Sequence, residues 1–84
     1  MPIAFVLINT RLGAESEVVK KLLEIDGVEE AYTVYGVYDI VAKIVADDLD
    51  KLREIITWNI RRIDKILSTT TMVVMEGYKR ERKK

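Results

Sequence analysis

The stretch Thr33–Val45, TVYGVYDIVAKIV, decides the fold of this chain. Apolar and β-branched residues lie on both sides of Gly36, and such residues favour strands. Glycine adopts the positive φ angles that tight turns need, so the pattern predicts a hairpin that turns at Gly36–Asp39. A two-residue turn would be enough for a hairpin. Two interpretations therefore stay open: an ordinary turn, or a turn that also holds a ligand.

The segments on either side of this hairpin alternate between strand and helix patterns. An apolar, branched run precedes a helical repeat that ends at Asp26-Gly27, and Asp47 or Asp48 is placed to cap a second helix. The apolar stripe of that second helix is expected at Leu49, Leu52, Ile56, Ile60 and Ile63. The expected elements are a strand at 3–10, a helix from 12 to about 25, strands at 28–35 and 38–46, a helix at 48–63 and a strand at 66–76.

The order β-α-β-β-α-β predicts an α+β fold, the ferredoxin-like sandwich of two split β-α-β halves. Right-handed crossovers give an antiparallel four-stranded sheet in the order 4-1-3-2, with both helices on one face. The other face is left uncovered and carries apolar residues such as Ile3, Phe5 and Leu7. An uncovered apolar face calls for a partner, most simply a second copy related by two-fold symmetry.

The charges are divided unevenly along a chain of 84 residues that suits one small domain. We expect a folded domain at residues 1–78, with nine basic and 13 acidic residues, and a basic tail at 79–84. An acidic body does not fit a nucleic-acid footprint, and a short charged terminus is usually solvated. No direct DNA binding is therefore expected.

The residue types that are missing exclude several kinds of chemistry. The chain has no cysteine and no histidine, which removes disulfides, a thiolate nucleophile and the usual zinc and copper ligands. No Ser/His/Asp set and no glycine-rich phosphate loop is present. We expect no catalytic residue, no metal and no cofactor. Without an apolar run of 18 residues or a basic leader, we expect no membrane span and a cytoplasmic location.

Two groups of polar residues are candidates for ligand binding. Asp39 could receive an ammonium group or could accept backbone hydrogen bonds as a turn residue, and Gly36 could expose its N–H to a carboxylate or serve only the hairpin. The run Ser68–Thr71 places four hydroxyls on the last strand. Alternation directs Thr69 and Thr71 to one face and the other two to the opposite face. Threonine is also an ordinary strand residue. For Trp58, next to the Arg61-Arg62 pair, we expect helix packing or a subunit contact in preference to a cation–π or recognition role.

The motif Gly36-Val37-Tyr38-Asp39 comes between two strands, the second of which ends at a helix cap. The last strand carries Ile66, Thr69, Thr71, Val74 and Met75 at the spacing Val-x-x-Thr-x-Thr-x-x-Val-Leu. Together with the element order, over residues 3 to about 76, these motifs resemble the effector-binding half of the Lrp/AsnC (feast/famine) transcription regulators. That half is known as the RAM domain.

The resemblance implies dimers that join through their sheets and assemble into octamers or other rings. It also implies an amino acid or similar effector bound between dimers. The effector-binding residues it points to are Gly36, Tyr38, Asp39, Thr69 and Thr71. Backbone N–H groups near Gly36 would meet the ligand carboxylate, and Asp39 and the threonines would meet its polar groups. Family members commonly have threonine and an acidic residue where this chain has Tyr35 and Val37, so the resemblance leaves open both which ligand is preferred and whether ligand binding is retained.

Residue 1 already adjoins the first expected strand, so we expect a stand-alone domain without the family's helix-turn-helix half. Such a protein would sense an amino acid itself or assemble with full-length Lrp/AsnC regulators. Two alternatives stay open: a purely structural assembly partner, and a small dimeric ferredoxin-like enzyme. Such enzymes usually need a histidine, an asparagine or a cofactor.

Overall fold

The computed structural model describes residues 1–77 and residue 80. The basic tail predicted at 79–84 lies, apart from Arg80, outside the described residues. The elements are β1 (Ile3–Thr10), α1 (Glu15–Leu23), β2 (Val28–Thr33), β3 (Ile40–Val45), α2 (Leu49–Glu54), the π-helix η1 (Ile55–Ile60) and β4 (Ile66–Val73).

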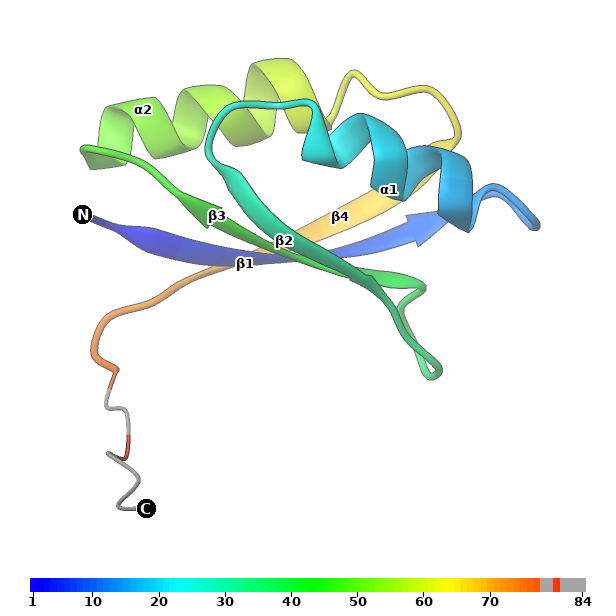
Figure 1. Ribbon diagram of the computed structural model, residues 1–84, viewed down its shortest axis with the longest axis horizontal. Coiled ribbons are helices and arrows are strands. Elements are labelled where there is room, and N and C mark those ends of the chain that lie inside the picture. The colour runs from blue at the N-terminus through cyan, green and yellow to red at the C-terminus, as the bar shows by residue number, and fades with distance from the viewer. Residues whose placement is uncertain (78–79, 81–84) are drawn as a thin grey trace.

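The four strands form one antiparallel sheet in the order β2-β3-β1-β4, which is the predicted order. The helices α1 and α2–η1 lie on one face of this sheet, and the loop between β2 and β3 projects beyond it on the other side (Figure 1). The predicted ferredoxin-like α+β fold is confirmed. Strands β2, β3 and β4 are two to three residues shorter than predicted at the hairpin and at the C-terminal end.

The core lies between β1, β3 and the two helices. Ala4, Val6 and Ile8 on β1 are fully buried, and each is paired across the ladder with a fully buried residue of β3. From the helices, Val18 and Leu22 pack onto this layer. Because every second residue of a strand points to the same face, this single alternation on β1 positions both helices.

The second helix begins as predicted and then widens. The carboxylate of Asp48 accepts a hydrogen bond of 2.7 Å from the backbone N–H of Lys51, so Asp48 is the N-cap. Further along, the N–H of Arg61 donates to the carbonyl of Ile56, five residues earlier, which is a π-helical bond. The wider turn buries Ile55 together with Ile56 and Ile60. The predicted stripe is wrong at Leu49, which is 57% exposed.

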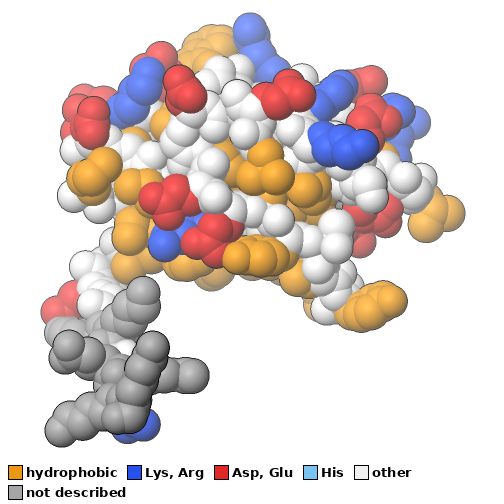
Figure 2. All heavy atoms as spheres, in the orientation of Figure 1, with side chains coloured by type: hydrophobic (Ala, Val, Ile, Leu, Met, Phe, Trp, Pro, Cys, Tyr) orange, Lys and Arg blue, Asp and Glu red, His pale blue; other side chains and the backbone are white. Residues whose placement is uncertain are grey.

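The other face of the sheet is covered by no part of the described chain. It carries Ile3, Phe5 and Leu7 of β1, which lie in the ladders beside β3 on one side and β4 on the other. Figure 2 shows hydrophobic side chains along this lower margin of the molecule. The apolar residues of this open face are Ile3, Phe5, Leu7, Val41, Val45 and Met72.

Toward β2 the open face becomes polar, but its charges are paired. Lys43 lies 3.5 Å from a carboxylate oxygen of Glu29 and 3.7 Å from one of Glu30. The hydroxyl of Tyr32 donates to the Glu30 carboxylate, and this hydrogen bond raises the pKa of Tyr32. The apolar strip on β1 is therefore bordered on this side by one lysine that is paired with two glutamates.

The turn from α1 into β2 brings backbone close to backbone. Gly27 has a φ of +98°, and a Cβ at this position would lie 2.6 Å from Cδ1 of Ile55 and 3.1 Å from the carbonyl oxygen of Val45. Val45 also donates its N–H to the Gly27 carbonyl at 2.8 Å. Because Gly27 has no side chain, the end of α1 can pack closely against β3 and η1.

We predict that Gly27→Ala lowers the free energy of unfolding more than Gly13→Ala does. Gly13 also has a positive φ, +81°, but no atom lies within 4 Å of its added Cβ. Both variants carry the left-handed backbone cost of about 1–2 kcal/mol. Only Gly27→Ala adds overpacking, about 1–3 kcal/mol more. Urea denaturation of the two variants measures the difference, and equal losses would contradict this account of the turn.

Candidate functional site

Asp39 fastens the base of the hairpin to the end of β1. Its N–H donates to the carbonyl of Ile8, its carbonyl accepts from the N–H of Val34, and its Oδ2 accepts from the N–H of Thr10, each at 2.9 Å. Thr10 is 6% exposed, so this carboxylate oxygen satisfies a backbone donor that water barely reaches. Oδ2 of Asp39 therefore has a structural role, because it accepts a backbone hydrogen bond as expected of a turn residue.

A polar cleft lies between the hairpin and the first turn of α1. Its volume is about 460 Å³, and it is lined by Glu15, Ser16, Thr33, Val34, Tyr35 and Asp39. Gly36 sits beyond this cleft on the exposed tip of the hairpin, with a φ of +136° and open space where a Cβ would be. Its backbone is accessible to an approaching group.

Tyr38 lies on the open face of the sheet. Its hydroxyl is 3.3 Å from Oγ1 of Thr70, which is paired with Leu7 on the open face. Because β1 separates β3 from β4 in the sheet, the Tyr38 side chain crosses over β1 to make this contact. Tyr38 is thereby held on the face away from the helices.

Thr69 and Thr71 point the opposite way, as the alternation predicts. In the β1–β4 ladder Thr69 is paired with Ile8 and Thr71 with Val6, and both of these partners face the helices. The hydroxyl oxygen of Thr71 is buried and has no hydrogen-bond partner among the described residues. A buried hydroxyl without a partner is uncommon in folded proteins and calls for an explanation.

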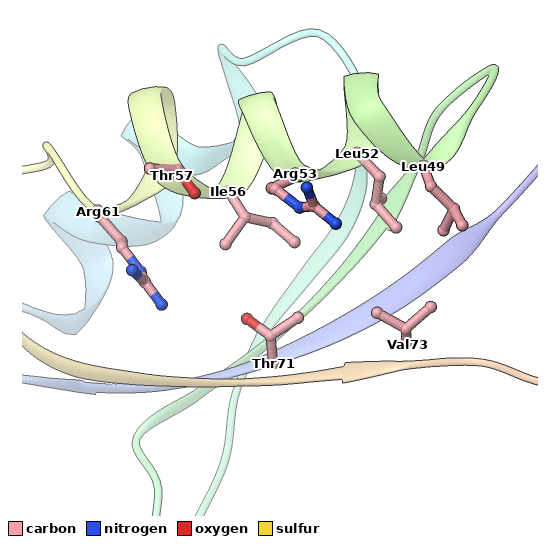
Figure 3. Close-up of a pocket in the computed structure, with 8 residues that line it drawn as sticks. All are labelled: Leu49, Leu52, Arg53, Ile56, Thr57, Arg61, Thr71 and Val73. Carbon is pink, nitrogen blue, oxygen red and sulfur yellow. The ribbon is translucent and has the colours of Figure 1, made fainter.

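That hydroxyl faces a groove between the second helix and the edge strand β4. Figure 3 shows it pointing from β4 toward the helix, with Arg61 reaching down from the helix toward it. The groove has a volume of about 210 Å³. Its walls are aliphatic, its polar groups are threonines and arginines, and its lining residues are Leu49, Leu52, Arg53, Ile56, Thr57, Arg61, Thr71 and Val73.

Sequence reasoning missed three polar residues of this groove: Arg53, Thr57 and Arg61. They recur every four residues, which places them on one side of a helix, and this spacing is the signal that could have found them. Arg62, the next residue, turns away and lies over the Trp58 ring, 5.0 Å from its centroid. Arg62 lies in the turn after η1, so this cation–π contact joins the π-helix to the turn that follows it.

The five residues predicted from sequence therefore occupy three places in one chain. Asp39 and Gly36 lie at the hairpin, Tyr38 lies on the open face, and Thr71 lies in the groove, with Thr69 on the same face as Thr71. Residues 1–77 and 80 contain no cluster of three or more carboxylates that could hold a metal ion. No helix in this described part of the chain is long and apolar enough to cross a membrane.

We predict that Asp39→Ala destabilises the ligand-free protein by about 1–3 kcal/mol, because it leaves the buried N–H of Thr10 without an acceptor. Asp39→Asn keeps an oxygen at this position and should cost clearly less. Urea denaturation in the absence of any added amino acid makes the comparison. If Asp39 served a ligand alone, neither variant would change the free energy of unfolding.

The family model described as the Lrp/AsnC ligand binding domain matches residues 3–83. A curated relative is the HTH-type transcriptional regulator FL11 of Pyrococcus furiosus, 32% identical over 77 residues. The alignment covers 92% of this chain and 50% of the relative, so the chain spans about half the length of that protein.

Solved structures share the fold closely. The crystal structure of FFRP-DM1 has a TM-score of 0.85 and 44% identity, and the match covers 89% of this chain and all of the other. The transcriptional regulator NMB0573 of Neisseria meningitidis, solved as a complex with L-Met, has a TM-score of 0.83 at 12% identity. That match covers 94% of this chain and 53% of the regulator, and at this identity it shows the fold alone. The family match over nearly the whole chain confirms the resemblance read from its motifs: the chain belongs to the Lrp/AsnC ligand-binding domain family.

Proposed function

We propose that this protein is an oligomeric module that binds a small effector of the amino-acid class and modulates transcription. It would do so by sensing the effector itself or by assembling with full-length regulators of its family. Membership of a ligand-binding domain family supports effector binding. The modulation of transcription is supported by relatives that are transcriptional regulators. Action on transcription also implies the cytoplasmic location expected from the sequence. The protein would be a binding module and not an enzyme.

The observation that carries the proposal is the buried, unpartnered hydroxyl of Thr71 beside an open groove. Leaving such a group unsatisfied costs about 1–3 kcal/mol. A ligand with a polar group in the groove would remove that cost on binding.

The hairpin of a neighbouring copy would complete this site. Gly36 lies at an exposed tip, and the residues around it are apolar, with Tyr35 fully exposed and Val37 84% exposed. Apolar side chains on a projecting tip are typical of a surface that is covered in an assembly. Seated against a partner's groove, the backbone N–H near Gly36 would meet the effector's carboxylate, while Thr69 and Thr71 of the partner would meet its other polar groups.

We assign Asp39 and Tyr38, the other two hairpin residues that the resemblance points to, to positioning the hairpin. Asp39 keeps the hairpin in place through one oxygen and leaves the other facing the polar cleft. Tyr38 braces the hairpin against Thr70 of β4 across the open face. Both would shape the site more than they bind the ligand directly.

Dimers would form through the open face of the sheet. Phe5 lies at its centre, in ladder contact with Lys43 and Met72, and the strip around it is aliphatic. Burying such a strip against a second copy gains about 25 cal/mol for each Å² of apolar surface removed from water. The ion pairs of Lys43 at the β2 side would then lie toward the rim of the interface.

We predict that Phe5→Lys weakens dimerisation by about 3 kcal/mol or more, because it places an unpaired charge in the interface. Leu23→Lys is the matched control, since Leu23 is an exposed leucine on the helix side. Sedimentation velocity measures both variants, with circular dichroism to check that each is folded. A folded Phe5→Lys variant that sediments like the parent protein would rule out this face as the interface.

We predict that at least one of the twenty amino acids raises the melting temperature, by mass action. At one hundred times the Kd, the gain in stability is about 2.7 kcal/mol. Thr71→Val should abolish this shift, because the isosteric methyl group cannot hydrogen-bond the ligand. The same variant should leave the ligand-free melting temperature unchanged or higher, since it removes an unsatisfied group.

Ser68→Ala, on the same strand but the opposite face, where its hydroxyl lies 3.4 Å from Nδ2 of Asn9, is the control that should retain the shift. A screen in which no amino acid changes the melting temperature would contradict effector binding. Co-purification of a full-length regulator that is unaffected by any amino acid would then favour the alternative, a purely structural assembly partner.

A further inference from the structure

We infer that the groove between α2–η1 and β4 selects an effector with a negatively charged side chain, so that the amino acid bound is acidic. Glutamate and aspartate share this chemistry. The inference rests on the proposed function and names the ligand class of the same site. It is carried by the charge of the groove, which the family resemblance does not supply.

The groove is positively charged and has no acidic residue in its lining. Two of its eight lining residues, Arg53 and Arg61, carry guanidinium groups, and none is Asp or Glu. Neither arginine forms an ion pair with a carboxylate in the described part of the chain. Lys21, Lys51 and Lys65, in contrast, are each paired with a glutamate. The groove therefore presents two guanidinium groups that form no ion pair in the described residues, although Arg53 also lines a neighbouring hollow with Asp50 and Glu54.

The geometry brings these charges together with the unpartnered hydroxyl. Arg53 lies in α2 and Arg61, eight residues later, is the C-cap of η1, and both line the same groove. In Figure 3 both extend along the helix side of the groove, and Thr71 points toward the helix from the opposite wall. A carboxylate between them could accept hydrogen bonds from guanidinium N–H groups and from the Thr71 hydroxyl.

The aliphatic walls of the groove would increase its selectivity for an acidic side chain. Leu52 and Ile56 on the helix and Val73 on the strand would contact the methylene groups of a side chain and exclude water from its end. Electrostatic attraction is stronger where water is excluded. A side-chain amide of the same shape would lose the charge interaction, and a side-chain ammonium group would be repelled.

The volume of the groove suits a single side chain. About 210 Å³ is below the roughly 300–1,000 Å³ of pockets that enclose whole drug-sized ligands. The amino group and the α-carboxylate of the ligand would therefore lie at the mouth, where the hairpin of a neighbouring copy can reach them. The hairpin of the neighbouring copy would then recognise the amino group and the α-carboxylate of the ligand, and the groove would recognise the charge of its side chain.

Isothermal titration calorimetry of the full chain tests this with L-glutamate and L-aspartate against L-glutamine, L-asparagine and L-lysine. We expect glutamate or aspartate to bind at least about tenfold more tightly than its amide, the equivalent of about 1.4 kcal/mol. Arg53→Gln and Arg61→Gln should each weaken the acidic ligand about tenfold to hundredfold, as expected for a lost charge-assisted hydrogen bond. Arg62→Gln, beside Arg61 but over Trp58, should bind like the parent protein.

The possible results distinguish a wrong ligand class from a wrong proposed function. If a neutral amino acid binds as tightly as the acidic pair, and Thr71→Val abolishes that binding while both arginine variants retain it, the site stands and the acidic selectivity is wrong. If no amino acid binds the parent protein, the proposed function fails and this inference fails with it. If Arg62→Gln weakens binding as much as Arg61→Gln, the effect comes from net charge and the inference is overturned.

Discussion

The structure depends on one strand, β1, which is apolar on both faces and lies at the centre of the sheet. Its helix-facing residues Ala4, Val6 and Ile8 are fully buried by α1 and α2–η1. Its other face carries Ile3, Phe5 and Leu7, and no described part of the chain covers it. A single layer of helices can satisfy only one face of a sheet. The apolar residues on the uncovered face of the central strand would therefore favour association with a second copy.

The proposed ligand site arises from the change in residue type between the central strand and the edge strand. In the β1–β4 ladder, the aliphatic residues Val6 and Ile8 of β1 are paired with Thr71 and Thr69 of β4. Above the edge strand the helix contributes Arg53 and Arg61 at the rim of a groove. Aliphatic packing between the helix and the sheet is therefore replaced by polar groups at the edge of the sheet, which is where the proposed site lies.

Much of the fold could be predicted from the sequence, because the signals are local and agree with one another. The order of elements, the strand order, the cap at Asp48 and the alternation of Thr69 and Thr71 are all confirmed. The π-helix was not predictable, because adjacent isoleucines at 55 and 56 and a third at 60 fit more than one helical register. Packing against the sheet determines which of these registers the helix adopts, and here it favours the wider π-helical turn.

The candidate site was harder to predict. Alternation correctly divides the threonines between the two faces, but Tyr38 precedes β3 in an irregular turn, where alternation gives no direction. The family motifs indicate five residues that one chain holds in separate places, because the proposed site needs two copies. The arginines of the groove lie outside those motifs, and their role follows only from the cavity they line.

The measurement that tests this account most directly is a crystal structure of the assembled protein grown with L-glutamate. The account predicts ligand density in the groove of one copy, within hydrogen-bond distance of Oγ1 of Thr71, with the Gly36 hairpin of a neighbouring copy at the mouth. An assembly whose grooves are empty, or whose hairpins lie far from every groove, would contradict it.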